Sequence, residues 1–125
     1  MSSRSKGQRT ELKAVAFLAT LPNTAPIRIR QTSRFASEQP CDLIALRAGY
    51  WSRFVEVRSN QWRTGRESTQ QLAALPGEGY HKQIWLFRDG QTTPEVRQWN
   101  GREWVRKDGP WSDAESEGMP VPDDE

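Results

Sequence analysis

Hydrophobic and polar positions alternate through residues 41–59, CDLIALRAGYWSRFVEVRS, and this alternation predicts two strands joined by a short turn. With the turn centred on the single glycine of the stretch, Ile44 lies opposite Phe54 and Asp42 lies opposite Glu56. Like charges that face each other across a ladder destabilise a sheet. We therefore expect a cationic group to sit between the two carboxylates.

The N-terminal residues follow a helical period. Ser5 and Gln8 form a capping box, and Pro22 ends the helix. The apolar side chains form one broad arc that also contains a carboxylate, Glu11. An unpaired carboxylate on a core-facing stripe is costly, so Glu11 either faces a cation or reaches solvent near the positive end of the helix. The arc consists of Leu12, Ala14, Val15, Ala16, Leu18 and Ala19.

The rest of the chain reads as strands with one short helix between them. The order helix, three strands, helix, strand and hairpin predicts an α/β domain in which helices flank a mixed β-sheet. The further elements are a strand over 25–31 with one wet face, a polar linker over 32–40, a helix over 66–75 capped by Thr64 and Glu67, a strand over 82–90 buried on both faces, and a hairpin over 95–107 that turns at Asn100 and Gly101.

Charge is distributed unevenly along the 125 residues. All 18 Lys and Arg residues and 10 of the 16 acids lie in residues 1–110, a net charge of +8, and the other six acids follow. An arginine-rich basic body suits a phosphate-bearing partner, although an ordinary solvated surface has the same composition. We assign residues 1–108 to a single domain and expect residues 109–125 to form an acidic, disordered tail.

Several classes of protein are disfavoured by composition. No run approaches the roughly 20 apolar residues of a membrane span, and residues 1–10 lack the apolar stretch of a signal peptide, so we expect a cytoplasmic protein. The lone Cys41 allows no internal disulfide and fits a reducing compartment. The lone His81 excludes a zinc site built from histidines.

Three carboxylates stand out by position: Glu11 on the helical stripe, and Asp42 and Glu56 on neighbouring strands. Hard divalent cations take oxygen ligands, and Mg²⁺ commonly uses one or two protein carboxylates together with phosphate and water. A metal ion would supply the cation that the facing pair requires.

Residues 40–59 resemble the PD-(D/E)XK nuclease superfamily, whose hallmark is an Asp on one strand and a Glu-any-Lys triplet on the next. Pro40 with Asp42, and then FVEVRS, occupy these places. The preceding helix SKGQRTELKAVAFL, the following helix RESTQQLAAL and the strand KQIWLF complete the resemblance over roughly residues 5–90. The short form, the Lys-Gly-x-x-x-Glu-like opening and the basic loop before the Asp look most like archaeal-type and phage Holliday junction resolvases.

The resemblance implies a restriction-endonuclease-like core and a Mg²⁺-dependent endonuclease, with Mn²⁺ as a substitute. By analogy Asp42 and Glu56 hold the ion, and Glu11 completes the acidic cluster directly or through water. The family's lysine, usually assigned to activating water, falls at Arg58, whose pKa is too high for a base. Three interpretations follow: Arg58 is an active variant, Lys82 or a nearby Gln has taken over, or the protein binds DNA without cutting it.

The implied substrate is branched DNA, cut by a homodimer, and so short a nuclease suits a phage acting in DNA recombination in the host cytoplasm. Alternatives on the same fold are an inactive DNA-binding protein and a restriction, homing or repair nuclease. Trp99 and Trp104 belong either to a dimer surface or to the core. Trp62 either stacks on an unpaired base or packs on its own scaffold. Arginines that bracket the site are candidates for phosphate contacts: Arg28, Arg30, Arg34, Arg63 and Arg66.

Overall fold

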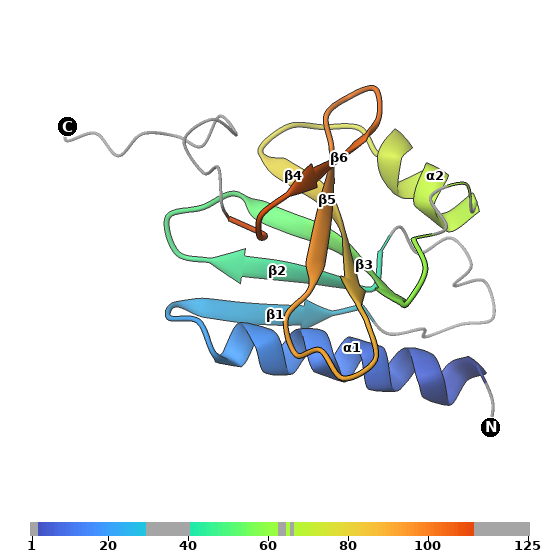
Figure 1. Cartoon of the computed structure of the whole chain (residues 1–125). Coiled ribbons are helices and arrows are strands. Elements are labelled where there is room, and N and C mark those ends of the chain that lie inside the picture. The colour runs from blue at the N-terminus through green and yellow to red at the C-terminus, as the bar shows by residue number, and fades with distance from the viewer. Residues whose placement is uncertain (1–2, 30–40, 63–64, 66, 112–125) are drawn as a thin grey trace.

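The computed structural model describes residues 3–29, 41–62, 65 and 67–111, with side chains from residue 9 onward. Figure 1 shows the elements along the chain. They are α1 (Ser3–Ala19), β1 (Thr24–Arg28), β2 (Leu43–Arg47), β3 (Ser52–Ser59), α2 (Glu67–Ala74), β4 (Tyr80–Phe87), β5 (Glu95–Trp99) and β6 (Trp104–Lys107). This is the order that the hydrophobic pattern predicts.

The strands form one six-stranded sheet in the order β1-β2-β3-β4-β5-β6. Neighbouring strands are antiparallel except for β3 and β4, which are parallel. A parallel pair needs a crossover connection, and α2 lies in the segment that provides it. The predicted α/β fold with a mixed sheet is therefore confirmed.

The register of the central hairpin is the predicted one. Ile44 pairs with Phe54 and Leu43 pairs with Val55, so the next step of the same register sets Asp42 against Glu56. The turn contains Gly49 at a φ of 86°, a left-handed conformation that glycine adopts without steric cost.

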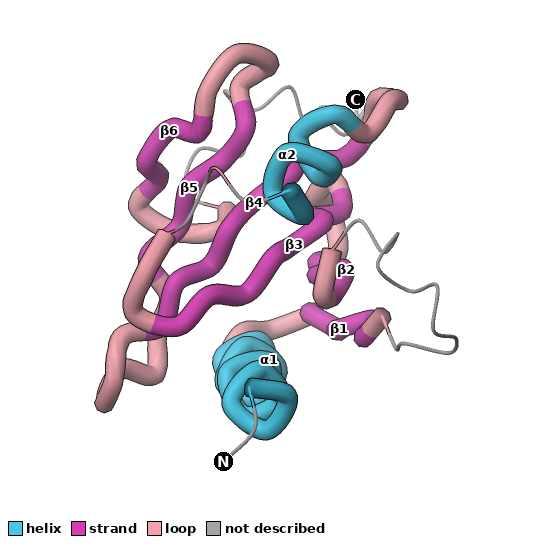
Figure 2. Tube along the Cα trace, turned by 90° about the vertical axis from the view of Figure 1, so that its right-hand side faces the viewer, coloured by secondary structure: helices cyan, strands magenta, loops and turns pink. Residues whose placement is uncertain are grey.

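The two helices cover opposite faces of the sheet (Figure 2). Because side chains alternate along a strand, the odd-numbered positions of β3 and β4 face α1 and the even-numbered positions face α2. Trp85 illustrates the α1 side, where Phe17 packs edge-on against its ring at 5.7 Å. The α1-side core comprises Ala14, Leu18, Leu43, Ala45, Val55, Val57, Trp85, Phe87, Val96 and Trp111.

The buried face of α1 is narrower than the predicted arc. The row Thr10, Ala14 and Leu18, spaced four residues apart, lies against the sheet, whereas Leu12 is 51% exposed. The helix meets the sheet along this row and through Phe17 beside it, so Leu12 turns to the far side. In β4 the prediction of burial on both faces is confirmed, since residues 83–87 are all buried.

The packed domain extends beyond residue 108. Pro110 is buried, Trp111 belongs to the core, and the Pro110 carbonyl accepts hydrogen bonds from Arg53 and Gln83, both at 3.0 Å. The charge pattern predicts a domain boundary at residue 108, because the residues that follow are acidic. This composition gives no indication that Pro110 and Trp111 pack against the domain. Residues 112–125 of the predicted tail lie outside the described residues. No helix in the described part of the chain is long and apolar enough to cross a membrane.

Candidate active site

Asp42 is fixed at the start of β2 by backbone bonds to both neighbouring strands. Its N–H donates to the Val55 carbonyl at 2.9 Å, and its carbonyl accepts from the N–H of Ile29 at 3.0 Å. The carboxylate oxygen Oδ2 accepts a bond of 2.8 Å from the N–H of Val57. The side chain is therefore aimed at β3, the strand that carries Glu56.

Burial raises the pKa of the Asp42 carboxyl above its usual value of 3.8. The Val57 N–H and the Arg58 charge act in the opposite direction, and the charges of Glu56 and Glu11 raise the pKa further. Both of the other predicted acids thus act electrostatically on Asp42. A cation placed against this carboxylate would relieve the effect.

Glu56 projects from the middle of β3 toward α2 and is only 3% exposed. Its Oε2 contacts Nη2 of Arg58 at 2.5 Å. Its Oε1 is buried and has no hydrogen-bond partner among the described residues. One oxygen of this carboxylate is therefore compensated and the other is left open.

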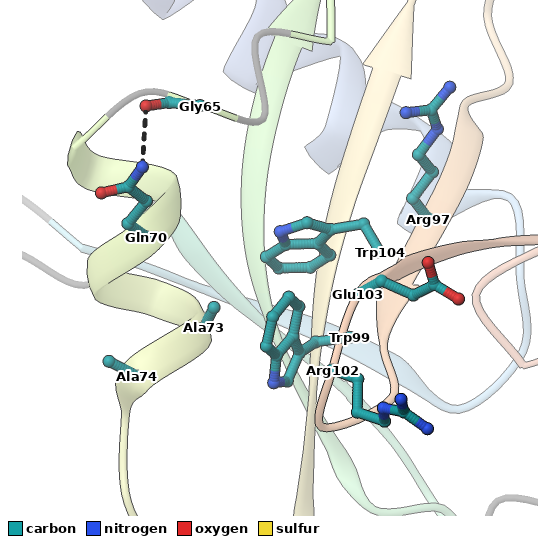
Figure 3. Close-up of a pocket in the computed structure, with 9 residues that line it drawn as sticks. All are labelled: Gly65, Gln70, Ala73, Ala74, Arg97, Trp99, Arg102, Glu103 and Trp104. Atoms are coloured by element: carbon teal, nitrogen blue, oxygen red, sulfur yellow. Dashed lines mark hydrogen bonds between the residues drawn. The ribbon is translucent and has the colours of Figure 1, made fainter.

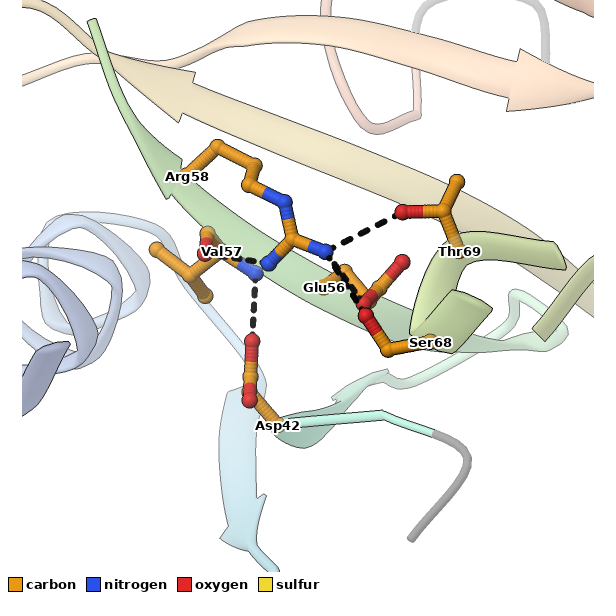
Figure 4. A network of polar contacts seen from close by, with 6 residues as sticks. All are labelled: Asp42, Glu56, Val57, Arg58, Ser68 and Thr69. Carbon is orange, nitrogen blue, oxygen red and sulfur yellow. Dashed lines mark hydrogen bonds and ion pairs between the residues drawn. The ribbon is translucent and has the colours of Figure 1, made fainter. Parts of the chain in front are cut away.

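Arg58 supplies a cationic group to one of the two facing acids, Glu56. Its Nη2 donates to Glu56, to Ser68 Oγ at 3.2 Å and to Thr69 Oγ1 at 3.1 Å, and its Nη1 donates to the Val57 carbonyl at 3.2 Å. Figure 4 shows the guanidinium lying between Glu56 and the first turn of α2, while the Asp42 carboxylate points to Val57. Arg58 thus joins the acidic strand to the helix that covers it.

Glu11 faces a cation rather than solvent. Its Oε1 accepts from Nε of Arg28 on β1 at 2.6 Å, and the two side chains are 19% and 33% exposed. Arg28, a predicted phosphate contact, is therefore held by Glu11 in this structure. The ion pair ties α1 to the edge strand beside Asp42.

The acidic side chains fit a hard divalent cation as a pair and not as the predicted trio. Within the described residues, no group of three or more His, Cys, Asp or Glu side chains is arranged to hold a metal ion. Asp42 and Glu56 remain as a carboxylate pair with an open buried oxygen on Glu56. Two carboxylates suffice for Mg²⁺ when water and substrate phosphate complete the shell.

Lys82, an alternative to Arg58, is engaged elsewhere. Its Nζ donates to the carbonyls of Ala73 and Leu75 at 2.7 and 2.6 Å. These groups belong to the C-terminal end of α2, where a cation satisfies unpaired carbonyls and favours the helix dipole. The amide of Gln70 likewise donates to the Gly65 carbonyl at 3.1 Å.

Of the predicted nucleic-acid contacts outside the acid cluster, Trp62 is described, and it packs on its own scaffold. The guanidinium of Arg97 lies 4.1 Å from the centre of its ring, a cation–π contact. Trp99 and Trp104 form a half-buried pair on the β5–β6 hairpin, with ring centres 5.3 Å apart. Arg30, Arg34, Arg63 and Arg66 lie outside the described residues.

Two contributors to the site were missing from the sequence analysis. Ser68 and Thr69 hold Arg58 through their hydroxyl groups, and their adjacent positions in the first turn of a helix were the available signal. Cys41 is buried next to Asp42. Burial, with the nearby charges of Asp42 and Glu56, raises the pKa of its thiol to about 12, so the thiol stays neutral.

No protein-family model matches the chain, and no curated protein matches it. Among solved structures, the chain is similar to Archaeoglobus fulgidus Hjc, a Holliday junction resolvase from an archaeal hyperthermophile. The match has a TM-score of 0.47 and 18% sequence identity, and it covers 88% of this chain and 97% of that chain.

Proposed function

We propose that the chain is a Mg²⁺-dependent, structure-selective DNA endonuclease of the Holliday junction resolvase type, with Mn²⁺ as a substitute ion. The observation that carries the proposal is the carboxylate pair Asp42, directly before β2, and Glu56 on β3, which the register of the hairpin sets opposite each other. One buried oxygen of Glu56 has no hydrogen-bond partner among the described residues. Burying two such acids is costly unless a cation meets them. The Asp and Glu-x-Arg spacing, with a glutamate on the preceding helix, supports the same conclusion.

The chain's own residues have separable roles in this proposal. Asp42 and Glu56 would hold the ion, which when bound would polarise a phosphoryl oxygen and lower the pKa of water. The guanidinium group of Arg58 offers positive charge and hydrogen bonds to a phosphate. Glu11 orients Arg28, and it would complete the acidic cluster directly or through water.

The proposed partner is DNA with a branch, and two copies of the chain place one site on each of two strands. The excess of Lys and Arg in residues 1–110 gives such a complex a strong electrostatic component. A homodimer from a phage, acting in the host cytoplasm during recombination, fits this reading.

A second candidate is an inactive nuclease fold that binds DNA. It is favoured by one observation: Arg58, at the lysine position, already contacts Glu56, Ser68 and Thr69. An ion on Glu56 must then share this carboxylate with the guanidinium or displace it. A third candidate, based on the same carboxylates, is a restriction, homing or repair nuclease.

Cleavage of a labelled four-way junction, beside a matched duplex, tests the proposal. The wild type with Mg²⁺ or Mn²⁺ should give paired symmetric nicks in the junction, and Asp42→Asn and Glu56→Gln should give none while still binding the junction in EDTA. Loss of both substrates at equal rates would favour a general nuclease. Gel shifts without cleavage in either metal, and activity gained by Arg58→Lys, would favour the binding protein.

A further inference from the structure

A cavity of about 610 Å³ lies between α2 and the β5–β6 hairpin, within the range of small-molecule sites. Figure 3 shows the lining side chains from both elements. The hairpin contributes Trp99, Trp104, Arg97 and Arg102, and the helix contributes Ala73 and Gln70. The cavity is separate from the acid pair, and neither the fold nor the proposed chemistry requires it.

Two aromatic faces are presented to this space. Trp99 and Trp104 are cross-strand partners at the end of the hairpin, and their rings are inclined at 58°. Both indoles are only half-buried, and Figure 3 shows them directed toward α2. On that side Ala73 has a single methyl group, so room remains for a flat ring to lie against the indoles.

The hairpin turn holds this pair firmly. The side-chain oxygen of Asn100 accepts hydrogen bonds of 2.8 Å from the N–H groups of Arg102 and Glu103. The N–H of Asn100 donates to the Glu103 carbonyl at 3.1 Å. The indoles are therefore positioned before any ligand arrives, which lowers the entropic cost of binding.

Charge selects among ligands with an aromatic ring. Among the described residues that line the cavity, Arg97 and Arg102 are cationic and Glu103 is the one acid. Two tryptophans alone would also suit a quaternary ammonium group, but the two guanidinium groups repel a cation. They favour a ligand that joins a flat ring to an anion, as a nucleotide does.

The cavity opens on the same face of the sheet as the acid pair. Glu56 pairs with Ile84, and Ile84 pairs with Arg97, so these three side chains form one row across β3, β4 and β5. Two strand spacings separate the ends of the row, roughly 10 Å. This distance equals about three nucleotide steps along one strand of a duplex.

The helix that forms the far wall is tied at both ends. Arg58 binds the hydroxyl groups of Ser68 and Thr69, and Lys82 binds the carbonyls of Ala73 and Leu75. The position of α2, and hence the width of the cavity, depends on residues of the strands beside the acid pair.

We propose that this cavity binds one unpaired base of a nucleic-acid strand, stacked on Trp99 with the inclined ring of Trp104 against its edge, and with Arg97 and Arg102 contacting the adjoining phosphates. The inference rests on the proposed function and deepens it, because a strand that supplies an unpaired base about three nucleotide steps from the cleaved phosphate differs from a regular duplex. It also explains why the hairpin places two half-buried tryptophans beside arginines.

Fluorescence anisotropy with a labelled single-stranded oligothymidylate in EDTA tests the proposal, with an abasic strand of equal length for comparison. The wild type should bind the base-bearing strand roughly 5- to 150-fold more tightly, as stacking of one base implies. Trp99→Ala should abolish most of this preference. Equal affinity of the wild type for both strands would overturn the proposal.

Two further variants keep the test independent of damage to the fold. Ala73→Leu leaves both indoles in place, suits a helix and extends a branched side chain into the cavity, so the preference should fall as in Trp99→Ala. Trp51→Ala removes a half-buried tryptophan that stacks on His81 instead, and it should keep the preference. An undiminished preference in Ala73→Leu would place the base elsewhere.

The outcome is separable from that of the proposed function because EDTA prevents metal-dependent cleavage. A base preference that depends on Ala73 and Trp99, without cleavage in any metal, would support the cavity and refute the nuclease. Junction cleavage without a base preference would support the nuclease and refute the cavity. Tighter binding of a trimethyl-lysine peptide than of the oligothymidylate would also refute the nucleotide assignment.

Discussion

Replacing Arg58 with alanine probes the contact on which the site depends. Glu56 is 3% exposed and its Oε2 is bound by Arg58, so the substitution leaves a buried carboxylate without its cation. Removing one partner of a buried ion pair costs about 3–5 kcal/mol. At roughly 4 °C for each kcal/mol in a domain of this size, the unfolding midpoint should fall by about 12–20 °C.

Thermal unfolding followed by circular dichroism at neutral pH measures this change. Arg88→Ala is the matched control, because Arg88 also binds a glutamate at 2.6 Å, but the two side chains are 46% and 37% exposed. An exposed pair contributes only about 0–1 kcal/mol, so the control should unfold within about 4 °C of the wild type. If Arg58→Ala and Arg88→Ala unfold at the same temperature, the reasoning about Glu56 is refuted.

A second substitution distinguishes two causes of the lost stability, the uncompensated charge of Glu56 and the lost packing of the Arg58 side chain. Adding Glu56→Gln to Arg58→Ala removes the uncompensated charge, so most of the lost stability should return. Mg²⁺ provides a further readout that does not depend on cleavage. The ion should raise the unfolding midpoint of Arg58→Ala more than that of the wild type, because it replaces the missing cation.

The remaining predictions concern single groups around the site. Since the pKa of Asp42 is raised in the folded state, its ionisation opposes folding at neutral pH, and this penalty disappears as the pH falls through the folded pKa toward 3.8. Asp42→Asn should therefore raise the unfolding midpoint at pH 7, and thermal scans at successively lower pH should show the gain vanish; a gain that persists in acid would contradict this cause. Lys82→Met should destabilise α2 by about 1–3 kcal/mol through loss of two charged hydrogen bonds, visible as faster amide exchange in residues 67–74, and unchanged exchange would exclude the capping role. Cys41, buried and with a pKa of about 12, should resist alkylation at pH 8 in the folded protein and react after denaturation; rapid labelling of the native protein would show that the start of β2 opens.

The sheet was predictable because its signals are local. Alternation fixed the face of each strand, and the glycine turn fixed the register that opposes Asp42 and Glu56. Glu56 and Arg58 lie two residues apart on one strand, so their contact also follows from the strand period.

Other features depend on packing between distant segments. The partners of Arg58 on α2 and the position of Lys82 are set by how the crossover helix docks, which no local period encodes. Leu12 belongs to the predicted apolar arc but is exposed, because helical periodicity predicts the arc and not the row of side chains that contacts the sheet. Trp111 was assigned to the tail because a composition average conceals one anchoring side chain.

The contacts of Arg58 suit an arginine at this position better than a lysine. A guanidinium group has its N–H donors in a planar fork. Arg58 reaches a carboxylate and two hydroxyl groups of α2 through Nη2 and a backbone carbonyl through Nη1, while its Nε is buried without a hydrogen-bond partner among the described residues. An ammonium group is a compact point charge and cannot span these positions in the same way. Arg58→Lys should therefore loosen α2 even if it supports cleavage. Arg58 also holds α2, which forms one wall of the cavity beside Trp99 and Trp104. A substitution at the acid pair should therefore alter binding of the base in that cavity.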